Sequence, residues 1–156
     1  MSHIVRFFRR LNQLLAMIPQ DLSLLLSRVA IASVFWRSAQ TKISGWEFLG
    51  QSWEFFNIGS GTILLFQYEY NLPLLPPKLA AYLGTGVEFF MPLLLLLGLA
   101  TRFASLALLT MTAVIQFLVF PDAWPVHILW VAILVYLLKS GSGRLGVDYL
   151  LAGKAP

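Results

Sequence analysis

An ionisable residue, Glu88, lies inside the apolar stretch "GTGVEFFMPLLLLLGLATRFASL", which runs from Gly84 to Leu106. An ionised carboxylate in hydrocarbon is costly, so a chain that keeps one there normally supplies either a partner for the charge or a proton. Such a buried pair can hold a quinone carbonyl, relay a proton, or only fix which helices pack together. The partner of Glu88 is therefore the first question that the sequence raises.

Arg28 is the partner that the sequence predicts. It lies about seven residues from one end of its own apolar stretch and Glu88 about ten from the same side of its stretch, so in two helices their heights differ by about 5 Å. Arg37 follows nine residues after Arg28, which places it on the opposite helix face and close enough to the membrane surface to snorkel. We therefore predict a buried Arg28–Glu88 ion pair among the helices.

Lys42 extends this arrangement into a predicted polar seam. It follows fourteen residues after Arg28, almost four helical turns, so the two side chains share a face. The seam could continue to Gln116 and to His127. His127 could act as a pH-sensitive gate or as a donor to a quinone. Its place at a helix end is also typical of an interfacial residue. The candidate ligand site consists of Arg28, Lys42, Glu88, Gln116 and His127.

Other site classes find no support in the sequence. The two histidines, His3 and His127, lie far apart, and Met91 and Met111 have apolar neighbours typical of packing, so no metal site is predicted. The chain has no cysteine, so any redox chemistry would belong to a bound cofactor or a partner. No nucleophile stands beside a base, so no catalytic residue is assigned and no self-contained enzyme is predicted.

The composition predicts the elements that hold this seam. Hydrophobic residues make up 58% of the 156 residues and charged residues 12%, and the mean hydropathy is +0.77. These values indicate an integral membrane protein, and the basic residues at the ends of apolar runs indicate topology and not nucleic-acid binding. Stretches long enough to cross a bilayer as helices run from about Leu22 to Thr41, Leu79 to Gly98, Phe103 to Phe120 and Ala123 to Lys139. With short connections after the second and third, they predict an all-α fold, an antiparallel bundle of four transmembrane helices.

The distribution of basic residues predicts the orientation. The positive-inside rule places both termini in the cytoplasm. Residues 1–21 are predicted to be a cytoplasmic amphipathic lead-in, residues 22–151 the membrane domain and residues 152–156 a tail. The basic residues on the side of the termini are Arg6, Arg9, Arg10, Arg102, Lys139, Arg144 and Lys154, against Lys42 and Lys78 on the other side.

One long connection, from about Ile43 to Pro77, forms an external interfacial segment between the first and second helices. If "SGWEFLGQSWEFFN" is helical, Trp46, Leu49, Trp53 and Phe56 form one apolar stripe, typical of a helix lying in the membrane interface. These aromatic residues could anchor the protein at the membrane surface or line a ligand entrance.

Several motifs resemble those of the DoxX family of small four-helix membrane proteins. They are "RSAQTK" at the end of the first helix, "LGLATR" after the second and "GSGRLGVDYLL" after the fourth. The resemblance covers the chain from about Leu22 to Leu151, and "VFPDAWPVHILW" is similar to a subgroup encoded beside pathways of metal-binding, ribosomally made peptides. The pattern falls on Arg28, Lys42, Glu88, Gly98, Thr101, Arg102, Gly141, Gly143 and Asp148.

The family pattern also has a structural interpretation at the end of the chain. The glycines of "KSGSGRLGVD" can end the fourth helix and let the chain turn back beneath the bundle. Asp148 would then bind backbone amides or the side chain of Arg102 or Arg144, as a structural latch. Thr101 and Arg102 are predicted to cap and anchor the third helix.

The resemblance implies a redox role, because members of the family are linked to sulfur and redox metabolism, including a quinone-reducing subunit. The leading hypothesis is an inner-membrane accessory subunit of a redox or metal-stress pathway that binds a quinone in the polar seam. The first alternative is a small transporter or channel for a solute, ion or proton that uses Glu88 and works as a homo-oligomer. The second is a membrane scaffold that recruits a partner protein through its external segment. Expected partners are the lipid bilayer and proteins of redox or metal-peptide pathways.

Overall fold

The computed structural model describes residues 3–43, 47–48, 51–52, 58–73 and 75–152. Within these ranges, four helices are long and apolar enough to cross a membrane: Gln20–Gln40, Pro77–Leu97, Thr101–Val119 and Pro121–Ser140. The predicted spans are therefore confirmed to within a few residues at each end. The protein is an all-α, multi-pass membrane protein.

The described elements follow one another in a simple order. Pro77 stands at the start of α4, where a proline costs no hydrogen bond, and Gly98 ends α4 in the left-handed conformation. The elements are α1 His3–Leu15, α2 Gln20–Gln40, β1 Glu47–Phe48, β2 Gln51–Ser52, α3 Ser60–Leu64, the π-helix η1 Leu65–Tyr70, α4 Pro77–Leu97, α5 Thr101–Val114, the π-helix η2 Ile115–Val119, the 3₁₀ turn η3 Pro121–Ala123, α6 Trp124–Ser140 and α7 Val147–Leu151.

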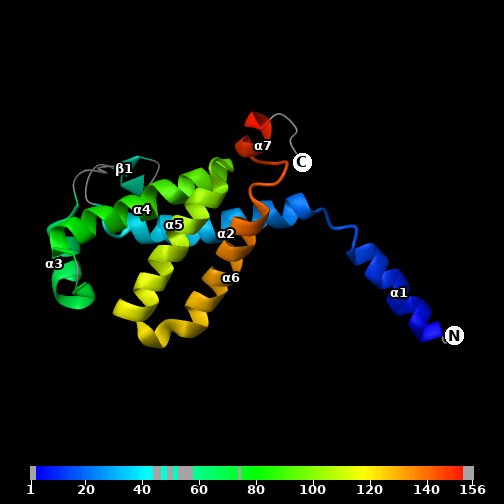
Figure 1. Ribbon diagram of the computed structural model, residues 1–156, viewed down its shortest axis with the longest axis horizontal. Helices are drawn as coiled ribbons and strands as arrows, with labels where there is room; N and C mark the ends of the chain where they lie inside the picture. Colours follow the sequence, from blue (N-terminus) through cyan, green and yellow to red (C-terminus); the bar gives the residue numbers. More distant parts are fainter. Residues whose placement is uncertain (1–2, 44–46, 49–50, 53–57, 74, 153–156) are drawn as a thin grey trace.

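The bundle is closed by four helix contacts. α2 packs against α4 and α6, and α5 packs against the same two helices. Figure 1 shows α2 beside α4, with α5 and α6 sloping away from that pair. Because the connections after α4 and α5 are short, neighbouring helices run antiparallel.

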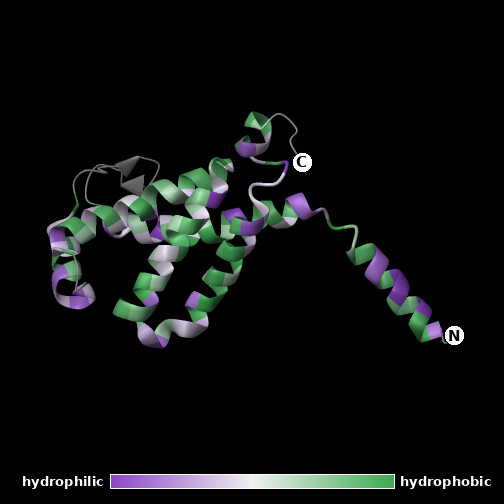
Figure 2. Cartoon of the chain, in the orientation of Figure 1, coloured by the Kyte–Doolittle hydropathy of each residue, from purple (hydrophilic) through white to green (hydrophobic). Residues whose placement is uncertain are grey.

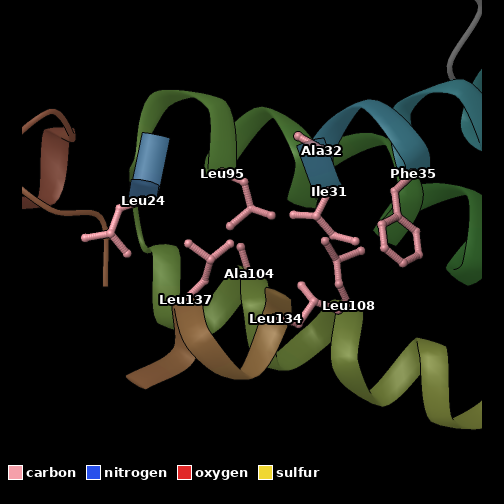
Figure 3. Close-up of a cluster of buried hydrophobic side chains, with 9 residues drawn as sticks. All are labelled: Leu24, Ile31, Ala32, Phe35, Leu95, Ala104, Leu108, Leu134 and Leu137. Atoms are coloured by element: carbon pink, nitrogen blue, oxygen red, sulfur yellow. The ribbon is translucent and has the colours of Figure 1, made fainter. Parts of the chain in front are cut away.

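The core lies where these four helices meet. Figure 3 shows side chains from all four pointing into the same space, including Ile31 of α2, Leu95 of α4, Leu108 of α5 and Leu134 of α6. These four side chains are fully buried. Outward-facing leucines on the same helices, such as Leu129 of α6, are exposed, as expected for side chains that contact lipid.

The sequence left the conformation of the external segment between α2 and α4 open. Its described central residues form the short antiparallel strands β1 and β2, so they do not adopt the helix that was considered for this stretch. The aromatic stripe of Trp46, Leu49, Trp53 and Phe56 lies outside the described residues. After the strands, α3 and η1 pack against α4.

The lead-in α1 extends away from the bundle (Figure 1). Figure 2 shows hydrophobic and hydrophilic residues alternating along it, and none of its residues is buried. Phe7 and Phe8 are exposed on this helix, near Arg9 and Arg10. Such a composition suits a helix that lies along a membrane surface.

Candidate functional site

Glu88 is bound by Lys42. The Lys42 Nζ atom lies 2.7 Å from Glu88 Oε2, and both side chains are only 4% exposed. Ser38 Oγ donates to Glu88 Oε1 at 3.1 Å and lies 2.7 Å from Lys42 Nζ. Ser38 and Lys42 are four residues apart, so both reach the same side of α2. These contacts form a buried triad in which the charge of the carboxylate is compensated.

The predicted Arg28–Glu88 pair is wrong. Arg28 Nη1 donates to the carbonyl oxygen of Leu95 at 3.3 Å, and Nη2 donates to that of Leu145 at 2.9 Å. Leu95 follows seven residues after Glu88, about 10 Å along α4. Arg28 therefore holds the end of α4 and the chain after α6, while Lys42 takes the place at Glu88 that was expected for Arg28.

Gln116 and His127 form a separate buried pair. His127 Nδ1 lies 2.7 Å from Gln116 Oε1, and Gln116 Nε2 donates to the carbonyl oxygen of Pro121 at 2.6 Å. This contact connects η2 to α6. The His127 ring also packs against Trp130, with a centroid distance of 4.8 Å. The five candidate residues thus lie in three arrangements and not in one continuous seam.

An apolar cavity lies beside the triad. It has a volume of about 230 Å³ and is lined by α4, α5 and the two π-helices, with Glu88 on its wall. Leu75 and Leu83 also line it and are 38% and 53% exposed, so the cavity has a lipid-facing rim. Ligand sites for drug-sized molecules begin at about 300 Å³, so this cavity suits a single ring and not a nucleotide cofactor.

Tyr70 of η1 gives the cavity a hydrogen-bond donor. It lines the cavity and packs edge-to-face on Phe66 at 4.7 Å and on Phe120 at 5.8 Å. Burial raises the pKa of the Tyr70 hydroxyl, and the negative charges of Glu88 and Glu69 raise it further. The phenol therefore stays protonated at neutral pH and can donate.

The backbone around the cavity departs from regular α-helix. Pro92 lies inside α4 one turn after Glu88, and because it has no N–H group, the Glu88 carbonyl loses its usual donor. Gly84 lets the Phe66 ring approach α4, since a Cβ atom there would lie 3.0 Å from Phe66 Cζ. Two π-helical segments, which often occur at functional sites, also line the cavity.

Asp148 forms the latch at the opposite end of α4. Its two carboxylate oxygens accept hydrogen bonds from the backbone N–H groups of Ala100, at 2.6 Å, and Thr101, at 2.9 Å. This is the backbone alternative of the two predicted for Asp148. The prediction that Thr101 caps α5 is wrong, because Asp148 supplies the cap and the Thr101 hydroxyl has no hydrogen-bond partner in the described part of the chain.

Tight glycine contacts complete the latch. Gly98 has a φ of +66°, and a Cβ atom there would overlap Arg28 Nη1 and the backbone of Gly146. Gly141 and Gly143 also have positive φ values, of 75° and 69°, and let the chain turn back after α6 as predicted. Arg102 Nη2 donates to the carbonyl oxygen of Lys139 at 3.3 Å, which joins the start of α5 to the end of α6.

Comparison with known proteins now gives the family. Residues 23–121 match DoxX, which covers more than half of the chain. The chain belongs to the DoxX family. It is also 28% identical over 142 residues to an uncharacterized protein of Haemophilus influenzae, and the alignment covers 86% of each chain. No solved structure matches the chain.

The residues of the DoxX pattern have two structural settings in this protein. Arg28, Gly98 and Asp148 belong to the latch, where their contacts are with backbone groups. Lys42 and Glu88 belong to the triad beside the cavity. The second setting combines a buried ion pair with an apolar cavity.

Sequence reasoning missed two polar residues of this candidate site. Ser38 could have been found, because its spacing of four residues from Lys42 places both on one helix face. Tyr70 carried no comparable signal, since the sequence left "TILLFQYEYNLPLLPP" undecided between helix and extended chain. Within the described residues, no group of three or more His, Cys, Asp or Glu side chains is placed to hold a metal.

Proposed function

We propose that this DoxX protein is an accessory membrane subunit that binds a quinone ring in the cavity beside Glu88 and supports a redox or metal-stress pathway. One observation carries the proposal: an apolar cavity of about 230 Å³ has both Glu88 and Tyr70 among its lining residues. The redox role rests on family resemblance, since the chain has no cysteine and would depend on a bound cofactor or a partner for electron transfer.

The two polar groups have complementary roles toward such a ligand. The protonated Tyr70 hydroxyl can donate to a quinone carbonyl, and a Glu88 carboxylate oxygen can accept from a quinol hydroxyl. Glu88 remains available because each carboxylate oxygen has more than one acceptor direction, and Lys42 and Ser38 each occupy one. The exposed Leu75 and Leu83 at the rim would let an isoprenoid tail leave the cavity into the bilayer.

Transport of an ion or proton through Glu88 is the alternative. The buried ion pair is compatible with it, because ionisable groups within membrane helices often mark ion pathways. However, Lys42 and Ser38 both hold the carboxylate in place, which favours a fixed binding group over a group that exchanges its partner during transport. A scaffold role depends on residues 46–56, most of which lie outside the described residues.

The proposed location is the bacterial inner membrane with both termini in the cytoplasm. Exposed Arg102, Lys139 and Arg144 lie at the end of the bundle that also holds the start of α2, which supports this orientation by the positive-inside rule. A fluorescent protein that folds only in the cytoplasm, fused after residue 156, should fluoresce. A dark but correctly inserted fusion would reverse the proposed orientation.

The function is tested by mass spectrometry of lipids extracted from protein purified in mild detergent. Wild-type protein should carry quinone in a near-stoichiometric amount. Glu88→Gln removes the negative charge and replaces one of the two acceptor oxygens by a donor NH2 group, and Ala107→Phe fills the cavity without changing charge, so both variants should lose the quinone. Val135→Phe places the same bulk on an exposed position of α6 and should retain it.

The outcomes separate the alternatives. Quinone retained by a folded Ala107→Phe variant would exclude this cavity as the site. If the wild-type protein neither retains quinone nor binds it when quinone is added, the proposal fails. Proton or ion flux in proteoliposomes that is lost in Glu88→Gln but kept in Ala107→Phe would then support transport.

A further inference from the structure

A second cavity lies at the end of the bundle where α2 begins and α6 ends. Its volume is about 670 Å³, and it is bounded by the start of α2, the start of α5, the chain after α6, and α7. Its wall is more polar than that of the cavity beside Glu88. The polar side chains on it include Arg102, Arg144, Ser140, Ser142 and Thr101.

The acidic and basic side chains of this cavity differ in how many of their hydrogen-bonding groups are already used. Of its two carboxylates, Asp148 binds two backbone N–H groups of α5, and Asp21 Oδ1 accepts from the backbone N–H of Arg144 at 2.7 Å. The guanidinium groups of Arg102 and Arg144 belong to exposed side chains. The contact of Arg102 with the Lys139 carbonyl uses one of its five N–H donors. The acidic groups are therefore directed to the backbone, while guanidinium donors remain for an anion.

The rim of the cavity is apolar. Phe103, next to Arg102, lines the cavity and is 61% exposed, and Leu150 and Leu151 of the adjacent α7 are 75% and 73% exposed. Free phosphate would gain nothing from such a rim. A phospholipid has both a phosphate, which suits the arginines, and acyl chains, which suit the exposed apolar side chains.

We propose that this cavity binds the headgroup of an anionic phospholipid. Arg102 and Arg144 hold its phosphate, and the acyl chains lie along Phe103 and α7. The bound lipid bridges α5 and the chain after α6, and so supports the latch formed by Asp148. This site is separate from the quinone cavity, and its existence does not depend on the proposed function.

The test measures lipid binding to the full-length protein in an uncharged detergent by native mass spectrometry. Phosphatidylglycerol should bind with higher affinity than phosphatidylcholine. A basic side chain near an anionic lipid surface contributes about a fivefold effect, so Arg102→Gln/Arg144→Gln should weaken phosphatidylglycerol binding about 25-fold. The control Lys78→Gln removes a charge from an exposed position at the start of α4, at the other end of the bundle, and should change binding less than about threefold.

Three outcomes would overturn the proposal. They are equal binding of the two lipids by wild-type protein, equal losses in the arginine variant and the lysine control, and displacement of the lipid by millimolar inorganic phosphate, which would indicate a soluble anion instead. If the double arginine variant does not fold, Arg144→Gln alone, at an exposed position, should still weaken binding about fivefold. Unchanged binding in that folded variant would also refute the site.

Discussion

The pairing of Lys42 with Glu88 can be tested by a double-mutant cycle. Each member is replaced by methionine, which keeps much of the side-chain length and removes the charge. With a separation of 2.7 Å and both side chains 4% exposed, either single change leaves the other charge buried without its partner. Breaking such a pair costs about 3–5 kcal/mol, whereas replacing both members by apolar residues is often nearly neutral. We therefore expect Lys42→Met/Glu88→Met to be more stable than either single variant.

The assay is the free energy of unfolding by a denaturing detergent in mixed micelles. The coupling energy of Lys42 and Glu88 should exceed about 3 kcal/mol, because the double variant lacks the unpaired buried charge that destabilises each single variant. Arg28 and Glu88 provide the matched comparison: Arg28 contacts carbonyls about 10 Å further along α4, so Arg28→Met and Glu88→Met should add to within about 0.5 kcal/mol. Coupling between Arg28 and Glu88, with additivity for Lys42, would refute the pairing.

Three further predictions concern the latch and the cavity. Gly98→Ala should destabilise the protein by at least about 2 kcal/mol in the same assay, because φ is +66° and the new Cβ would overlap Arg28; a change below about 0.5 kcal/mol would contradict the close contact. Asp148→Ala should lower the free energy of unfolding by about 1–2 kcal/mol, because the hydrogen bond to the Ala100 N–H is lost. Asp148→Asn should lower it less, and equal losses in the two variants would show that the charge of Asp148, and not its hydrogen bond, stabilises the protein. Tyr70 should ionise above the ordinary tyrosine pKa of 10.0. Its contribution to stability is therefore complete below pH 10 and is lost as the pH rises through the higher folded pKa. In an ultraviolet titration, this late transition should be absent from the Tyr70→Phe variant.

The four membrane spans were predictable because they depend on local composition. A bilayer requires about 20 apolar residues in a helix, and that condition is visible within each stretch alone. The turn after α4 was also predictable, since Gly98 adopts the left-handed conformation that favours glycine. Both features depend on residues that are close in sequence.

The partner of Glu88 was not predictable, because it depends on how far α2 is displaced along α4. Counting from the ends assumes that neighbouring helices begin at the same depth. In the structure, Arg28 is the ninth residue of α2 but contacts Leu95, the third residue from the end of α4. The first turns of α2 therefore extend beyond α4, as Figure 1 shows. This displacement moves Arg28 past Glu88 and brings Lys42 to it.

The division between latch and triad bears on where function can reside in this protein. Arg28 donates to two carbonyl oxygens that lie in or near turns, so a ligand could take those donors only by opening the turns. The Lys42–Glu88 pair, by contrast, adjoins a cavity and needs no change of backbone to meet a ligand. A variant that alters ligand binding without loss of stability should therefore map to the cavity wall, at positions such as Ala107 and Tyr70. If binding instead followed changes at Arg28 while stability stayed constant, the assignment of Arg28 to structure would be wrong.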